Sequence, residues 1–177
     1  MKVTLSASIS ILSTLACGLA LPDLTPRSLF FRPAIAVVIE EDFPATSFSP
    51  TTTAKASRSN GKHNVKTLLG FVVSACTGKC TISFTDALPA TGSPKLQLLT
   101  LGGYPADGNT WQSKPYTDAL KGTFQVSILG LATDVEDFGL TFDCPKTATK
   151  YGYEVQPVSD GSVAWDISTG GFIITCL

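Results

Sequence analysis

The clearest pattern along the chain is an alternation of apolar and polar residues in short segments. Alternation with a period of two is typical of β-strands that bury one face and expose the other. Two further apolar runs have the length and the β-branched content of strands, at residues 34–39 and 65–73. The alternating segments are residues 80–84, 123–128, 140–144, 151–155, 163–167 and 172–176.

Turn-forming residues separate these segments, as at Asp107-Gly108 and Asp160-Gly161. Many short strands divided by turns predict a single-domain, all-β antiparallel sandwich. Trp165 alternates in phase with Val163, so we expect its ring to lie in the core. Helical structure is expected only as one turn, at residues 116–120.

The N-terminal residues follow a different pattern. Lys2 precedes an uncharged stretch, and Gly18 and Ala20 place small residues where signal peptidase requires them for a cut before Leu21. The alternative is a transmembrane anchor, but the stretch is short for a bilayer and dense in Ser and Thr. We therefore expect a signal peptide at 1–20, a proline-containing spacer or propeptide at 21–34, and the domain at 35–177.

Composition excludes several functional classes. The chain carries 13 Lys and Arg against 14 Asp and Glu, and only 15% of its residues are charged. This leaves no broad basic surface for nucleic acid or an anionic membrane. The 44% hydrophobic content is too high for a disordered chain. We expect no nucleic-acid partner, no membrane anchor and no cofactor.

Four cysteines remain once the signal peptide is removed. An even number of cysteines in an oxidising compartment predicts two disulfides, with three possible pairings. A zinc site is the alternative, but it favours paired C-x2-C segments, which this spacing does not provide. We expect disulfides and no metal. The four residues are Cys76, Cys80, Cys144 and Cys176.

Residues suited to catalysis are sparse. His63 is the only histidine, it lies in a polar segment typical of a turn, and the sequence contains no G-x-S-x-G motif. Asp134, Glu136 and Asp137 would suit a catalytic pair or a calcium site. We interpret them instead as a solvated loop between strands, and the chain as non-enzymatic.

The best candidate for ligand binding is the aromatic segment at residues 102–116. It places Tyr104, Trp111 and Tyr116 among Gly, Pro, Asp, Asn and Gln residues. Flat rings beside such polar groups are suited to stacking on sugars. The alternative is that Tyr104 and Trp111 fold inward and cover an open end of the sandwich.

Six segments of the chain together match the pattern of a known family. They are VI at 38–39, FPATSF at 43–48, FVVSACTGKCTISF at 71–84, FDCP at 142–145, YGYE at 151–154 and IITC at 173–176. These segments resemble the C-terminal domain of the fungal "ubiquitin 3 binding protein" (But-two) family. The resemblance covers residues 35–177 and departs from the family pattern at Val72, Ser74 and the additional Cys76. It implies no catalytic residues.

This resemblance changes two expectations. Composition alone predicts that residues 45–59, which include eight Ser and Thr, form an O-glycosylated or flexible linker. The resemblance predicts instead that residues 51–59 form an edge strand of the domain. Cys76 is extra to the family pattern and Gly78 allows a reversal, which favours Cys76–Cys80 with Cys144–Cys176. The competing arrangement joins Cys80 to Cys176 and Cys76 to Cys144.

The sequence thus predicts a secreted fungal β-sandwich, non-enzymatic, at the cell surface or at an interface with a host. A carbohydrate-binding module is the alternative function. Cell-wall polysaccharide and a host surface are the corresponding partners.

The first testable prediction concerns the N-terminus. The mature protein should begin at Leu21, because the small residues Gly18 and Ala20 direct cleavage there. N-terminal sequencing of protein from culture supernatant measures this directly. Retention of residues 1–20 would contradict the signal peptide.

Overall fold

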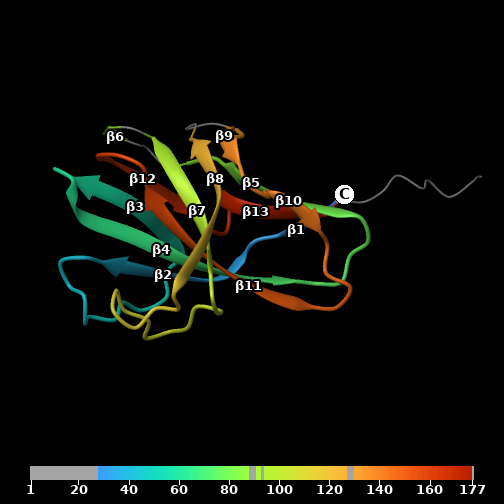
Figure 1. The fold of residues 1–177 in the computed structure, drawn as a ribbon, viewed down its shortest axis with the longest axis horizontal. Coiled ribbons are helices and arrows are strands. Elements are labelled where there is room, and N and C mark those ends of the chain that lie inside the picture. Colours follow the sequence, from blue (N-terminus) through green and yellow to red (C-terminus); the bar gives the residue numbers. More distant parts are fainter. Residues whose placement is uncertain (1–27, 88–90, 93, 127–129, 177) are drawn as a thin grey trace, which may run out of the picture.

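The computed structural model describes residues 28–87, 91–92, 94–126 and 130–176, so the expected signal peptide lies outside the described residues. Thirteen strands occur in this part of the chain, in agreement with the predicted all-β class (Figure 1). The described residues include no helix long and apolar enough to cross a membrane. The strands are β1 (Leu29–Phe31), β2 (Pro33–Glu40), β3 (Thr53–Ser59), β4 (Lys62–Val73), β5 (Lys79–Thr85), β6 (Thr91–Gly92), β7 (Lys95–Leu101), β8 (Thr117–Gln125), β9 (Thr133–Asp137), β10 (Thr141–Asp143), β11 (Thr149–Pro157), β12 (Gly161–Asp166) and β13 (Gly171–Cys176).

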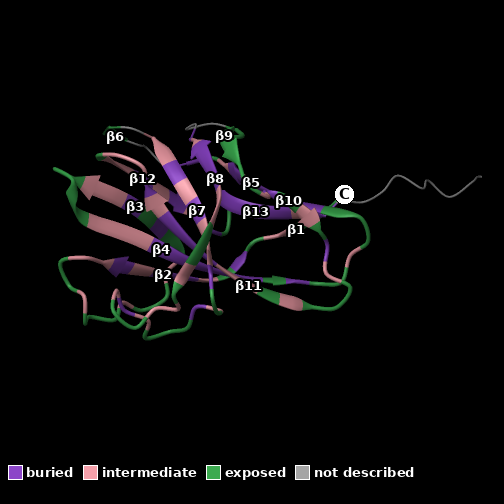
Figure 2. Ribbon diagram, viewed as in Figure 1, coloured by how far each residue is buried: buried purple, intermediate pink, exposed green. Residues whose placement is uncertain are grey.

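The strands form two antiparallel sheets. The small sheet has the order β1-β13-β5-β10, and the large sheet runs β6-β12-β3-β4-β11-β7-β8-β9, with β2 also paired to β4. The two sheets enclose one main core, where the buried faces of the strands meet (Figure 2). The predicted antiparallel sandwich is confirmed.

Aromatic rings fill much of this core. Phe84 of β5 and Phe172 of β13 meet edge to face, with ring centroids 4.8 Å apart, and Phe172 also meets Phe124 of β8 at 5.1 Å. Trp165 packs against Phe84 at 5.5 Å and is 0% exposed, as its alternation with Val163 predicts. Each such aromatic pair contributes about 0.5–1.5 kcal/mol beyond the apolar area it buries.

One threonine closes a gap in the large sheet. Strand β4 pairs with β3 near its start and with β11 from Thr67 to Val73. At the change of partner, the Thr67 hydroxyl donates to the Lys55 carbonyl oxygen (2.7 Å) and accepts from the Lys55 amide (3.0 Å). The side chain thus satisfies backbone groups of β3 that β4 no longer pairs.

Two local expectations are wrong, and strand pairing explains both. Residues 51–59 are not an edge strand, because β3 lies between β12 and β4, with Ala54 and Ala56 fully buried. The helical turn expected at 116–120 is instead the start of β8, which pairs with β7. The position of β3 and the strand conformation of β8 both depend on neighbouring strands, and the local sequence carries no pattern that predicts these neighbours.

The packed domain also begins earlier than residue 35. Strand β1, inside the expected spacer, pairs with the last strand, β13. Arg32 secures the crossing from one sheet to the other, because its guanidinium donates to the carbonyl oxygens of Gly170 (3.1 Å) and Thr169 (3.0 Å).

The disulfides differ from both of the arrangements considered above. Cys76 is joined to Cys176 (Cα–Cα 6.6 Å) and Cys80 to Cys144 (Cα–Cα 5.0 Å). Phe142 of β10 is the register partner of Cys80, and Cys144 follows two residues later on the same face.

A second contact explains why Cys76 does not pair with Cys80. Gly78 has the positive φ expected of it (92°), but the reversal places this segment beside residues 144–145. The Cys76 amide donates to Pro145 O and the Cys144 amide to Gly78 O, each at 3.1 Å. Cys76 is thereby brought to the end of β13, where it joins Cys176, while Cys80 joins Cys144.

A second prediction follows from these bridges, which close loops of 100 and 64 residues. On the loop-entropy account each contributes about 4–5 kcal/mol. Cys76→Ser and Cys176→Ser should therefore lower the melting temperature equally, and combining them should add little. Peptide mapping without reduction should yield the two pairs; a fragment joining Cys76 to Cys80 would contradict the structure.

Candidate functional site

The aromatic segment lies across the face of the large sheet that points away from the main core. Residues 102–116 connect β7 to β8 and run below β2 and β11 in Figure 1; we call them the outer loop. A second, smaller hydrophobic cluster lies on this face. It consists of Val37, Ile39, Leu68 and Leu101, with Ile35 and Trp111 packed against it.

A pair of glycines allows the outer loop to approach the sheet closely. Gly70 of β4 and Gly152 of β11 are register partners on neighbouring strands. A Cβ on Gly70 would lie 2.6 Å from the Tyr104 ring, and one on Gly152 would overlap the carbonyl oxygen of Gly103. The glycine pair thus forms a flat depression that larger residues would fill.

Tyr104 is a packing residue of this contact. Its ring lies against Gly70 and is half-buried, and the Lys150 Nζ lies 5.0 Å from the ring centroid. Burial raises the pKa of the Tyr104 phenol above its usual value of 10.0. The ring therefore covers the face of the sheet, and not an open end of the sandwich as the alternative interpretation expected.

A buried carboxylate lies under the outer loop. Glu154 of β11 has a side chain only 1% exposed, and it pairs through Oε1 with Lys66 Nζ (2.7 Å) and through Oε2 with Lys114 Nζ (2.6 Å). The Thr117 hydroxyl donates to Oε2 at 2.8 Å. Because Lys114 belongs to the outer loop and Lys66 to β4, the carboxylate joins the loop to the sheet.

The electrostatics of this cluster favour the ionised carboxylate. Burial by itself raises the pKa of Glu154, but the bonds from Lys114, Lys66 and Thr117 outweigh that effect and leave the pKa below its usual 4.5. Both oxygens are occupied, so Glu154 is not available as a general acid or base. Its role is to position the loop.

Trp111 is secured by the same cluster. The Lys66 Nζ lies 4.9 Å from the Trp111 ring centroid, which is cation–π geometry. Next to it, Thr110 Oγ1 accepts from the amides of Gln112 (3.2 Å) and Ser113 (3.0 Å). The Trp111 ring is half-buried against the smaller cluster.

Tyr116 is the most exposed ring of the predicted set. It is 69% exposed and lies flat against Gly102, where a side chain would displace it. A neighbouring loop brings a further ring that the sequence analysis did not select: Phe43 is 54% exposed, and the following Pro44 accepts from the Gln112 amide at 3.1 Å. The outer side of the molecule thus presents Tyr116 and Phe43 to solvent.

The only histidine lies at the start of β4 and is not among the side chains that contact Glu154. His63 Nδ1 pairs with Asp42 Oδ2 at 2.7 Å, and both side chains are exposed. Its backbone has a positive φ of 54°, so the polar segment turns as expected before β4 continues. This geometry indicates a hydrogen-bonded pair at the surface.

The acidic residues form strand β9 and not the loop that was expected. Asp137 accepts hydrogen bonds from the amides of Gly139 (2.8 Å) and Leu140 (2.7 Å), which lower the pKa of its carboxyl group. Glu136 accepts from the Thr123 hydroxyl at 2.5 Å. Partial burial, with the nearby charge of Asp137, raises the pKa of Asp134. Asp137 thus stabilises the turn that follows β9 by accepting hydrogen bonds from its backbone amides.

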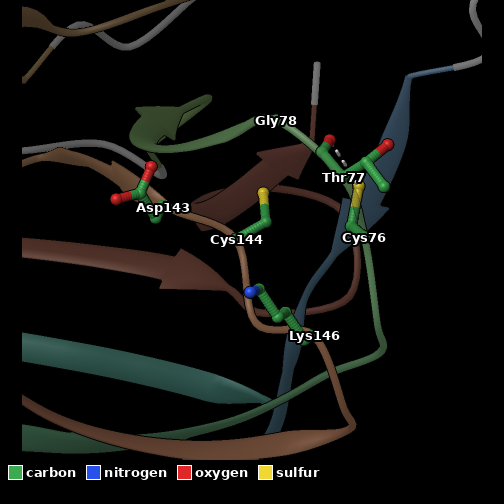
Figure 3. A pocket seen from close by; sticks show the side chains of 6 residues that line it. All are labelled: Cys76, Thr77, Gly78, Asp143, Cys144 and Lys146. Atoms are coloured by element: carbon green, nitrogen blue, oxygen red, sulfur yellow. Dashed lines mark hydrogen bonds between the residues drawn. The ribbon is translucent and has the colours of Figure 1, made fainter.

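A pocket of about 510 Å³ lies at the disulfide end of the molecule, lined by Cys76, Thr77, Gly78, Asp143, Cys144 and Lys146 (Figure 3). The sulfur atoms of Cys76, Cys144 and Cys176 lie within 4.8 Å of one another, which would suit a metal. Each of these sulfurs is in a disulfide and so is not available as a thiolate ligand. The pocket is the space beside two adjacent bridges.

No family model matches the chain, and no curated protein matches it. The resemblance to the But-two family therefore remains a prediction that rests on the quoted segments. The roles of residues in the outer loop follow from their geometry.

A third prediction concerns the buried carboxylate. Glu154→Gln leaves two lysines without a counter-charge and should lower the free energy of unfolding by about 3 kcal/mol. The pKa of Glu154 in the folded state lies below the usual 4.5. The ionised carboxylate should therefore make its full contribution to the free energy of unfolding above about pH 4.5, and this contribution should be lost as the pH falls further. Denaturant unfolding between pH 3 and pH 7 measures both effects.

A matched control is available for this substitution. Asp143 pairs with Lys79 at 2.7 Å, but both side chains are exposed, so Asp143→Asn should change stability little. Equal effects of the two substitutions would contradict the structural role of Glu154.

Proposed function

We propose that the chain is a secreted, non-enzymatic β-sandwich protein of fungal origin that acts at the cell surface or at an interface with a host. The observation that supports this most strongly is the pair of disulfides, Cys76–Cys176 and Cys80–Cys144. Disulfides that staple a small domain are typical of proteins that leave the reducing cytosol.

The use of the ionisable groups supports a non-enzymatic role. The carboxylate of Glu154 is paired with Lys66 and Lys114, and His63 pairs with Asp42 at the surface. Asp137 bonds the backbone of the adjacent turn. These groups perform structural tasks, which suits a protein that works by presenting a surface.

A carbohydrate-binding module is the second candidate, and the exposed ring of Tyr116 favours it. A ring fixed beside a rigid loop loses little conformational entropy on binding, which suits stacking on a sugar. Cell-wall polysaccharide is the corresponding ligand, with Phe43 as an additional contact on the same side.

Localisation and thiol state test the first proposal. The mature protein, without residues 1–20, should be recovered from the supernatant or the wall fraction with Cys76, Cys80, Cys144 and Cys176 resistant to alkylation until a reductant is added. Alkylation followed by mass spectrometry measures this. An intracellular protein with four free thiols would contradict the proposal.

A binding experiment tests the second candidate. If it is correct, the secreted protein should bind a wall polysaccharide saturably, and Tyr116→Ala should weaken binding about tenfold, since a stacked ring is worth up to about 1.5 kcal/mol. Phe138→Ala removes a ring of similar exposure (59%) elsewhere and is the matched control. Absence of binding on a glycan array would eliminate this candidate.

A further inference from the structure

One segment exposes a series of hydroxyl groups outside the two sheets. Residues 41–52 connect β2 to β3, and we call the second part of this connection, residues 45–52, the hydroxyl loop. Thr46, Ser47, Ser49 and Thr52 are all exposed there. None of their four hydroxyls is hydrogen-bonded to another described residue, whereas the nearby Thr51 hydroxyl accepts from the Thr53 amide at 3.1 Å.

The structure divides the Ser- and Thr-rich segment into two parts with different environments. Residues 53–59 form β3, an interior strand whose alternate residues, Ala54 and Ala56, are fully buried. Residues 45–52 belong to no strand, although the Thr51 amide donates to Ala36 O (3.0 Å) and the Thr52 carbonyl oxygen accepts from the Ile167 amide (2.9 Å). The composition that is typical of glycosylated segments therefore applies only to the hydroxyl loop.

The conformation of the hydroxyl loop suits a modifying enzyme. Residues 46–50 belong to no helix, strand or turn, and Pro50 disfavours a helical backbone at Ser49. Backbone bonds fix both ends: Thr46 N to Phe43 O (3.0 Å) at the start, and Thr51 N to Ala36 O (3.0 Å) near the end. The exposed hydroxyls are therefore accessible without unfolding of the domain.

We propose that Thr46, Ser47, Ser49 and Thr52 are acceptor sites for O-linked sugars. This inference rests on the proposed secretion, because the transfer takes place in the secretory pathway. The sugar donor is a phosphate-activated sugar. The hydroxyl oxygen bonds to the anomeric carbon, the bond from that carbon to the phosphate oxygen breaks, and the hydroxyl proton passes to a base of the transferase.

The fold accommodates sugars at these positions. Among the described strands, β2 pairs only with β4, and the Thr51 amide near the end of the hydroxyl loop donates to Ala36 O of β2 at 3.0 Å. The four acceptor side chains are exposed, so sugars on them meet solvent and not the core. The modification also covers a strand edge that otherwise invites pairing with another chain.

Mass spectrometry of the protein secreted by a eukaryotic host, expressed from the full-length chain, tests the inference. The intact supernatant protein should exceed the mass of the mature polypeptide, calculated from its sequenced N-terminus, by whole sugar residues. Peptide mapping with fragmentation that preserves the sugars should locate them on the peptide that contains residues 45–52. Replacement of Thr46, Ser47, Ser49 and Thr52 together by alanine should abolish the added mass.

A control variant replaces four exposed hydroxyls elsewhere, Ser59, Ser74, Thr133 and Thr147, and should keep the added mass. Oxidised supernatant protein with the bare polypeptide mass, or with sugars only outside residues 45–52, overturns this inference alone. A chain that stays in the cell with free thiols overturns the proposed function and the inference with it. Mapping of the unsubstituted protein decides the sites even if a variant folds poorly.

Discussion

Burial of the Glu154 charge constrains the whole outer side of the molecule. A carboxylate removed from water is tolerated only where partners replace its hydration, and here Lys66 comes from the sheet and Lys114 from the outer loop. The loop must therefore lie on the sheet. The glycine pair Gly70 and Gly152 permits this approach, and Trp111 then covers Lys66. Of the three predicted rings, this arrangement leaves Tyr116 the most exposed.

Disulfides secure the part of the molecule around Gly78 and residues 144–145. There the segment around Gly78 lies beside residues 144–145, and two disulfides connect it to β10 and to the last strand. The main core between the two sheets contains the aromatic rings of Phe84, Phe172 and Trp165. A sandwich fixed in this way has little freedom for induced fit, which suits a protein that presents a preformed surface.

The sequence predicts those parts of the fold that have a local signal. Strands such as β5 and β12 alternate plainly between buried and more exposed residues, and Trp165 is correctly placed in the core. Features set by distant partners were not predicted: β3 is interior because of β12, and Glu154 lies 88 residues from Lys66. The cysteine pairing depends in the same way on contacts with residues 144–145. Phe43 became a candidate only because its loop bonds Gln112.

Native-state hydrogen exchange on the outer loop tests the central claim, that Glu154 fixes this loop on the sheet. The amides of Gln112, Ser113 and Lys114 donate to Pro44 O, Thr110 Oγ1 and Thr110 O, so at neutral pH they should exchange far more slowly than free amides. In Glu154→Gln this protection should fall, while the Ile82 amide, bonded to Leu140 O, stays protected. Unprotected loop amides in the unsubstituted protein, or equal protection in the variant, would contradict the account.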